Sequence, residues 1–140
     1  MNAFVLNLEP ISYNNRNVTE NYKTEIRRMI SKETHNFLNS KLLYVRIYYF
    51  YNHDKRIDAD NMSKLIVDAM SKLIYSDDRQ VIYRIAAKVN LKHSNYQLGN
   101  SNIDINVLNK LLSSFVNKHT LYIEVDSISK YIPMTFGEPV

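Results

Sequence analysis

The chain has 140 residues, of which 45% are hydrophobic and 23% charged, proportions that exclude a disordered tail and predict one globular domain over residues 1–140. Its net charge is +4, and the excess is confined to residues 1–93, which carry 15 Lys/Arg against 10 Asp/Glu; this uneven balance favours a polyanionic partner. Cysteine is absent and only two glycines occur, which excludes disulfide scaffolds, thiol chemistry and Gly-rich GxGxxG or Walker A loops.

The predicted elements of the first half alternate between strand and helix. A strand over residues 4–8 is followed by a polar loop, after which Thr19 is expected to cap a helix that ends near Leu38. The apolar face of that helix is marked by spacings of three and four, at Tyr22, Ile26, Met29, Ile30 and Phe37. Residues 42–50 are apolar at both odd and even positions except at Arg46. A strand that is apolar on both faces is predicted to lie in the centre of a sheet.

The second half continues the alternation. Asp58 or Asp60 is expected to cap an amphipathic helix that ends near Leu73. Residues 80–90 alternate and predict a strand with Arg84 and Lys88 on one face. A helix over 105–115 and a strand over 121–125 complete the order β-α-β-α-β-α-β. This order predicts a single α/β (α+β) domain with a mixed sheet packed by helices.

No targeting segment is recognised in the sequence. No apolar run approaches the roughly 20 residues that span a bilayer, and residues 1–4 offer neither a basic region nor a cleavage site. We therefore expect a protein of the reducing cytoplasm.

Four aspartates flank the second predicted helix. Asp58 and Asp60 lie at its start, and Asp77 and Asp78 lie just after its end. The helix is roughly 22 Å long, so the two pairs meet only if a strand returns beside it. Clustered carboxylates repel one another unless a cation intervenes, and Mg²⁺ suits such a site because it takes oxygen ligands and leaves positions for substrate phosphate.

Two further charged residues lie on the same helix. Lys64 and Asp68 follow Asp60 at intervals of four, so the three share one face. Each of these features has a purely structural interpretation as well. An Asp-x-Asp pair is most often a helix cap with a neighbouring surface charge, and an Asp-Asp pair most often belongs to a turn. An Asp-Lys-Asp series at intervals of four is most often a set of solvent-exposed charges. An EF-hand is excluded, because the sixth position counted from Asp58 is not glycine and the twelfth is Ala69. A sugar-nucleotide site stays open on spacing alone.

The complete pattern is more specific than its parts. The string Asp58-x-Asp60-Asn61-x-x-Lys64-x-x-x-Asp68-Ala69-Met70, followed by Asp77-Asp78-x-Gln80-Val81, closely resembles the signature of the RusA family of Holliday junction resolvases. The strand before Pro10 and the loop Ser12-Tyr13-Asn14-Asn15-Arg16 resemble that family's opening, so the resemblance covers about residues 3–90. The sequence departs from the family pattern in two places. It has one residue fewer between the Asp-x-Asp pair and the Asp-Asp pair, and it lacks the Pro-Pro that precedes the N-terminal loop. Residues 92–118 look like an insertion and residues 130–140 like a tail.

The resemblance implies a homodimeric, Mg²⁺-dependent endodeoxyribonuclease, with Mn²⁺ as a substitute metal. Such an enzyme cuts four-way DNA junctions by paired symmetric nicks in recombination and repair, in a prokaryotic, phage or prophage setting. The family's catalytic metal-binding carboxylates match Asp58, Asp60 and Asp78, and its essential lysine matches Lys64. Asp77 is a further candidate for a metal ligand. Asn61 and Asp68 match positions of the motif with a supporting role. The shorter spacing leaves open which of the two adjacent aspartates is the main ligand.

DNA binding needs further cations, since a duplex presents one negative charge per roughly 1.7 Å. The candidates are Asn14, Asn15, Arg16, Lys23, Arg27, Lys55, Arg56, Arg79, Arg84 and Lys88. A four-way junction has two-fold symmetry, so a C₂ dimer is expected, with the first helix or residues 103–115 as its surface. Two alternatives stay open: a flap- or fork-directed nuclease of the same chemistry, and a junction-binding protein without catalysis.

Overall fold

A four-stranded mixed sheet with the order β1-β5-β2-β3 forms the centre of the molecule. The computed structural model describes residues 2–11, 16–53, 57–92, 97–99, 103–133 and 135–137, with the backbone alone for 97–99 and 135–137. The elements are β1 (Asn2–Leu6), α1 (Arg16–Ser31), β2 (Leu43–Tyr51), α2 (Ala59–Met70), the 3₁₀ turn η1 (Asp78–Gln80), β3 (Val81–Asn90), β4 (Gln97–Gly99), α3 (Ile105–Ser114), β5 (His119–Ser127), η2 (Ile128–Lys130) and β6 (Thr135–Gly137).

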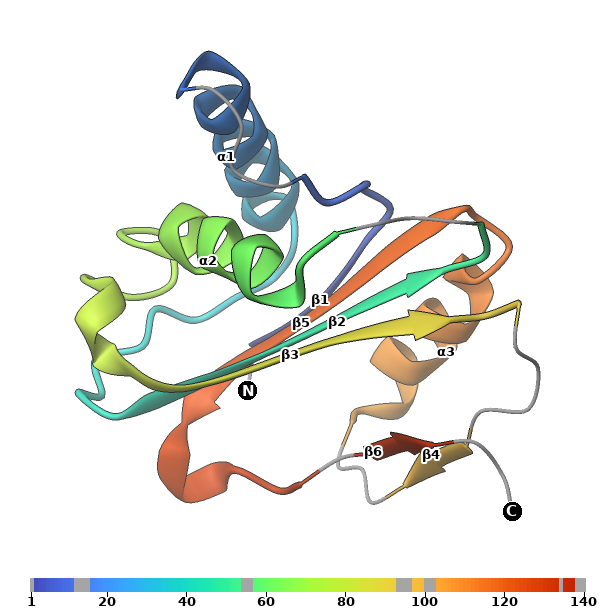
Figure 1. Cartoon of the computed structure of the whole chain (residues 1–140). Coiled ribbons are helices and arrows are strands. Elements are labelled where there is room, and N and C mark those ends of the chain that lie inside the picture. The colour runs from blue at the N-terminus through green and yellow to red at the C-terminus, as the bar shows by residue number, and fades with distance from the viewer. Residues whose placement is uncertain are drawn as a thin grey trace.

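The strand pairing confirms the predicted mixed sheet. β2 lies in the interior, antiparallel to β5 and parallel to β3, while β1 pairs antiparallel with β5. The parallel pair is joined through α2, so β3 returns beside that helix and forms one edge of the sheet. Helices α1 and α2 lie on one side of the sheet, and α3 lies on the other with the small β4–β6 pair (Figure 1). The α/β (α+β) class is therefore confirmed.

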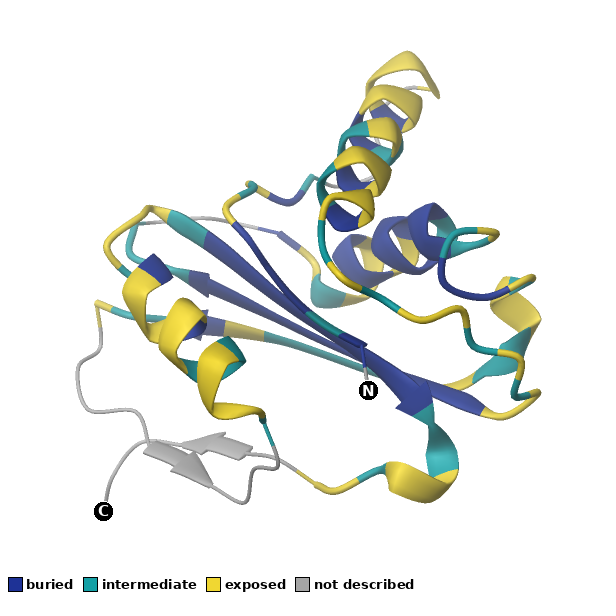
Figure 2. Cartoon of the chain, turned by 180° about the vertical axis from the view of Figure 1, so that it is seen from behind, coloured by how far each residue is buried: buried dark blue, intermediate teal, exposed yellow. Residues whose placement is uncertain are grey.

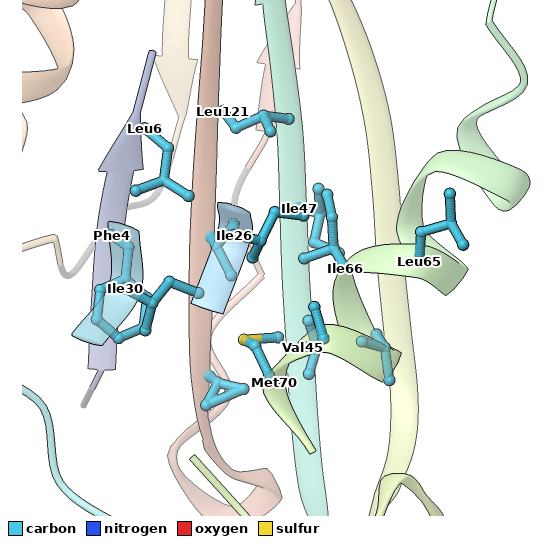
Figure 3. Close-up of a cluster of buried hydrophobic side chains, with 14 of the residues drawn as sticks. Phe4, Leu6, Ile26, Ile30, Val45, Ile47, Leu65, Ile66, Met70 and Leu121 are labelled. Atoms are coloured by element: carbon cyan, nitrogen blue, oxygen red, sulfur yellow. The ribbon is translucent and has the colours of Figure 1, made fainter. Parts of the chain in front are cut away.

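The side of the sheet that faces α1 and α2 holds the larger core. Helix α1 contributes Ile26 and Ile30, and α2 contributes Ile66 and Met70, all fully buried. These side chains meet strand residues such as Ile47 across the sheet surface (Figure 3). This packing fixes α2 against β2 and β3, and with it the position of every charged residue on the helix.

Helix α3 covers a smaller area on the other side. Its only fully buried apolar side chain among the described residues is Leu111, which packs with Val5, Phe50, Val89 and other strand residues. Most of the remaining surface of α3 is exposed (Figure 2). The sheet is thus covered unevenly, with the thicker layer on the α1–α2 side.

Helix α1 differs from its predicted limits. It begins at Arg16 and ends at Ser31, so Thr19 lies inside the helix, buried, rather than at its cap. Phe37 lies beyond the helix and is 47% exposed, so its predicted place on the apolar face is wrong. The spacing of Tyr22, Ile26 and Ile30 was sufficient to find the helix, but a threonine within its first turn resembles a cap in sequence.

Two local features also differ from the alternating pattern. A register shift between β2 and β3 pairs Leu43 with Val81 but Tyr44 with Tyr83, and it turns Val81 toward the core beneath α2. Within the residues predicted as a tail, 135–137 form β6 and pair with β4. No helix in the described part of the chain is both long and apolar enough to cross a membrane.

Candidate active site

The N-terminus of α2 is organised by Asp58. One carboxylate oxygen, Oδ1, accepts hydrogen bonds from the backbone N–H groups of Asp60 at 2.8 Å and Asn61 at 3.4 Å. This is the predicted cap, and it satisfies two N–H groups that the helix itself leaves unpaired. The second oxygen accepts no hydrogen bond from the described residues. Asp58 can therefore cap the helix and still offer one oxygen to a ligand.

The second acid pair divides into two roles. Asp77 caps η1: its carboxylate accepts the backbone N–H of Arg79 at 2.9 Å and also bonds the Arg79 guanidinium, while Gln80 closes a capping box. Gln80 in turn donates to the carbonyl of Ser40 at 2.8 Å, which ties this turn to the chain before β2. The side chain of Asp78, the next residue, does not cap η1 and lies near Asp68 of α2.

One acid from each pair lines a common pocket. The hollow, about 550 Å³ in volume, lies between α2 and the start of β3. Its charged lining residues are Asp60, Lys64, Asp68, Asp78 and Arg84. Asp58, Asn61 and Asp77 are not among the lining residues. The expected return of a strand beside the helix does bring the two acid regions together, through one member of each pair.

The acids after α2 are crowded enough to change their titration. The Arg79 guanidinium holds the pKa of Asp77 well below its usual range. The pKa of Asp78 is raised, first by its hydrogen bond to Asp77, then by partial desolvation and by the charge of Asp68. Asp77 therefore ionises first, and the carboxylate of Asp78 meets two like charges. This is the electrostatic environment that a divalent cation relieves.

Asp60 is paired across the pocket with Arg84 of β3, at 2.6 Å between Oδ1 and Nη2. Arg84 is one of the predicted DNA-binding residues, and in the structure it bonds an acid of the site. The Asp60 side chain is 77% exposed and that of Arg84 34%. Exposed pairs of this kind contribute only about 0–1 kcal/mol, so a metal ion or a phosphate can displace the contact at little cost.

A second hollow of about 410 Å³ adjoins the first and shares Lys64 and Asp68 with it. Its other wall is α1, which contributes Arg16, Glu20 and Lys23; Lys23 forms an ion pair with Glu20 at 3.1 Å. Sequence reasoning missed Glu20. Its spacing of four from Arg16 places both residues on one face of α1, but nothing in the sequence showed that this face meets α2.

The remaining predicted DNA-binding residues are distributed around these hollows. Lys88 is exposed on β3, on the strand face that Arg84 shares by alternation. The Arg79 side chain is 88% exposed and pairs with Asp77. Arg27 donates from Nε to the carbonyl of Ala69 at 2.9 Å. Outside the described residues lie Asn14, Asn15, Lys55 and Arg56.

Comparison with known proteins identifies the family. The sequence matches the family described as Endodeoxyribonuclease RusA over residues 9–106, a stretch that includes all the residues of both hollows. The chain belongs to the RusA family. A search of curated proteins finds no match. RusA enzymes are endodeoxyribonucleases that hydrolyse phosphodiester bonds to resolve Holliday junctions, and this chain is an enzyme of that kind.

The RusA assignment implies a divalent metal, and the pocket residues fit one. Among the described residues, no three or more Asp, Glu or His side chains lie close enough together to hold a metal ion by themselves. Mg²⁺ does not require such a cage, since it is commonly held by one or two carboxylates with waters and substrate phosphates. Asp68 and Asp78, which line the pocket together with Asp60, are such carboxylates, and the charge of Asp68 helps to raise the pKa of Asp78.

Proposed function

We propose that this RusA-family chain is a Mg²⁺-dependent, structure-specific endonuclease that resolves four-way DNA junctions by paired symmetric nicks. One observation carries the proposal. Carboxylates from both ends of α2, Lys64 and Arg84 line a single open pocket, where a phosphodiester can meet anionic metal ligands and cations at once. Asp77, whose carboxylate caps η1, does not line this pocket, whereas Asp60, Asp68 and Asp78 do.

The carboxylates would hold the metal. Asp60 and Asp78 are the main candidates because they line the pocket from opposite ends of α2, and Asp58 adds its uncommitted oxygen from the preceding turn. Between the two adjacent aspartates, Asp78 is the better ligand, since Asp77 is committed to Arg79. Bound Mg²⁺ activates water and neutralises phosphate oxygens.

The cations of the pocket would act on the phosphate. Lys64 stands on α2 between Asp60 and Asp68 and lines both hollows. As a mobile point charge it stabilises the negative charge that grows on the phosphate or on the leaving oxygen. Arg84, whose ion pair with Asp60 is partly hydrated, would orient a neighbouring phosphate oxygen.

Two nicks in opposing strands require two pockets related by the two-fold axis of the junction. A homodimer supplies them with one kind of site, and closed C₂ symmetry is the commonest arrangement for such assemblies. The proposal therefore includes a dimer. Sedimentation analysis with and without junction DNA tests the stoichiometry: a single protomer on a junction that is cut symmetrically would contradict it.

The deciding experiment compares a four-way junction, a flap and a linear duplex, each with Mg²⁺, Mn²⁺ or EDTA, for the wild type and Asp60→Asn. Paired metal-dependent nicks on the junction that Asp60→Asn loses while it still binds the junction support the proposal. Faster cutting of flaps or forks keeps the metal site and changes the substrate. Tight junction binding without cleavage under any metal overturns it in favour of a binding protein.

A further inference from the structure

A third hollow, of about 630 Å³, lies between α1 and the end of α2. It is formed by the C-terminal half of α1 and the turn that follows α2. Three cationic side chains line it, Arg27, Arg28 and Lys72, and none of its described lining residues is acidic. Both hollows of the active site contain acids. A cationic hollow without acids binds anions rather than metals.

Lys72 holds a backbone conformation that a lysine rarely adopts. Its φ is 69°, the only positive value at a non-glycine among the described residues. The turn is closed by its N–H, which donates to the carbonyl of Tyr75 at 2.5 Å, and by the bridge between Ser71 and Tyr75. The left-handed region costs a residue with a Cβ roughly 1–2 kcal/mol, a cost that glycine avoids. Strain kept at an exposed charged residue indicates that the side chain itself has a use.

The second cation is anchored at the same place. Arg27 donates from Nε to the carbonyl of Ala69 in the last turn of α2, so its guanidinium is held beside the Lys72 turn with its terminal nitrogens still available. Arg28 is paired with Glu25 and contributes little net charge. Lys72 and Arg27 form no ion pair with the described residues.

These two cations continue a row that begins at the active site. Arg16, Lys23 and Arg27 are seven and four residues apart on α1, and therefore share one helix face. The first two line the hollow that contains Lys64, and the third lines the hollow that contains Lys72. Helix α2 advances ten residues from Asp60 to its last residue, Met70, which is roughly 15 Å at a helical rise. The row therefore ends beside the C-terminal end of α2, at the opposite end of the helix from Asp60.

We propose that Lys72 and Arg27 form a second phosphate-binding site, which holds the backbone of a DNA arm beside the C-terminal end of α2, outside the active-site pocket. The ligand is a nucleic-acid phosphate, so the inference rests on the proposed function. This contact lies away from the phosphate that reacts. It fixes the direction in which a DNA arm leaves the active-site pocket. Phosphate contacts of this kind set position and orientation without reading sequence.

The strain at Lys72 makes an unusually clear test available. Lys72→Gly removes the charge and relieves the backbone, and Lys72→Asn removes the charge with a residue that tolerates the left-handed region. Lys130→Ala, an exposed lysine in η2 on the far side of the sheet, is the matched control. The measurement is the junction dissociation constant in EDTA, by fluorescence anisotropy between 50 and 200 mM salt, together with Tm.

Both Lys72 variants are expected to bind the junction roughly five- to tenfold more weakly at 0.1 M salt, with the slope of log K against log salt smaller by about 0.9. Lys72→Gly should do so with an unchanged or higher Tm, and Lys130→Ala should match the wild type in every measurement. Wild-type affinity and slope in both Lys72 variants would overturn this site, while junction cleavage by the wild type would leave the nuclease proposal standing. A wild type that binds no branched DNA would overturn both.

Discussion

The two faces of the central sheet each carry an arginine–carboxylate pair, in opposite environments. On the α3 side, Arg46 of β2 and Glu124 of β5 are 1% and 0% exposed, with 3.3 Å between their charged atoms. On the α2 side, the side chains of Arg84 and Asp60 are 34% and 77% exposed. Desolvation makes the first pair part of the fold, and hydration leaves the second free to exchange partners.

The surroundings of the buried pair show how a charge is kept inside. The Glu124 carboxylate accepts hydrogen bonds from the hydroxyls of Tyr44 and Tyr122. Arg46 donates to the carbonyl of Ile132 at 2.6 Å and lies 5.0 Å from the ring centroid of Tyr131. The segment after β5 thus covers this pair. Among the described residues no comparable cover lies over Asp60, whose side chain is 77% exposed, so the same kind of pair is closed off on one face and accessible on the other.

The largest expected effect comes from breaking the buried pair. Arg46→Met should lower the free energy of unfolding by about 3–5 kcal/mol, because Glu124 would remain buried without its cation. Urea denaturation measures the loss. The double variant Arg46→Met/Glu124→Gln should recover most of it, since the amide still accepts hydrogen bonds without a charge. A single variant that loses less than about 1 kcal/mol would show that the network is not a structural requirement.

The unequal cores of the two faces give the next prediction. Ile66→Ala, beneath α2, and Leu111→Ala, on α3, each empty a fully buried site and should cost about 2–5 kcal/mol. Ile66 belongs to the larger cluster of buried side chains, whereas Leu111 belongs to the smaller one, in which partly exposed neighbours make up more of the contacts and can close around the gap. We therefore expect the greater loss at Ile66. Equal losses by urea denaturation would contradict the difference between the faces.

A smaller effect separates capping from metal binding at Asp58. Asp58→Ala should cost about 1 kcal/mol through the lost cap, while Asp58→Asn keeps a capping oxygen and should be close to the wild type in stability. Both should lose Mg²⁺-dependent cleavage if the second oxygen holds the metal. Thermal melts and junction cleavage are the two measurements. Full activity in Asp58→Asn would assign the residue to the helix alone.

The smallest change in stability is expected at the exposed pair. Arg84→Met should shift the free energy of unfolding by no more than about 0.5 kcal/mol, because both partners are hydrated in its absence. It should also lower the Mg²⁺ concentration needed for half-maximal cleavage, since Asp60 would no longer be shared with a guanidinium. A metal titration of the two proteins tests this. A large loss of stability would place Arg84 with Arg46, as a residue of the fold.

Local pattern alone was enough for most of the elements and for the family. The apolar run of β2, the alternation of β3 and the periodicity of α2 were each visible within about a dozen residues, because such patterns follow from the geometry of a single strand or helix. The motif from Asp58 to Asp78 identified the family for the same reason: its residues lie close together in the chain. The limits of α1 were predicted less well, since the buried Thr19 resembles a cap in sequence.

Which charged residues meet was decided by the tertiary structure. The parallel return of β3 beside α2 brings Arg84 to Asp60 and Asp78 to Asp68, while Asp77 is bound to Arg79. Glu124 lies far from Arg46 in the chain, and no pattern around either residue foretold their pairing. Contacts between distant residues depend on how whole faces pack, and a hydrophobic pattern specifies that a face is buried without naming what it is buried against.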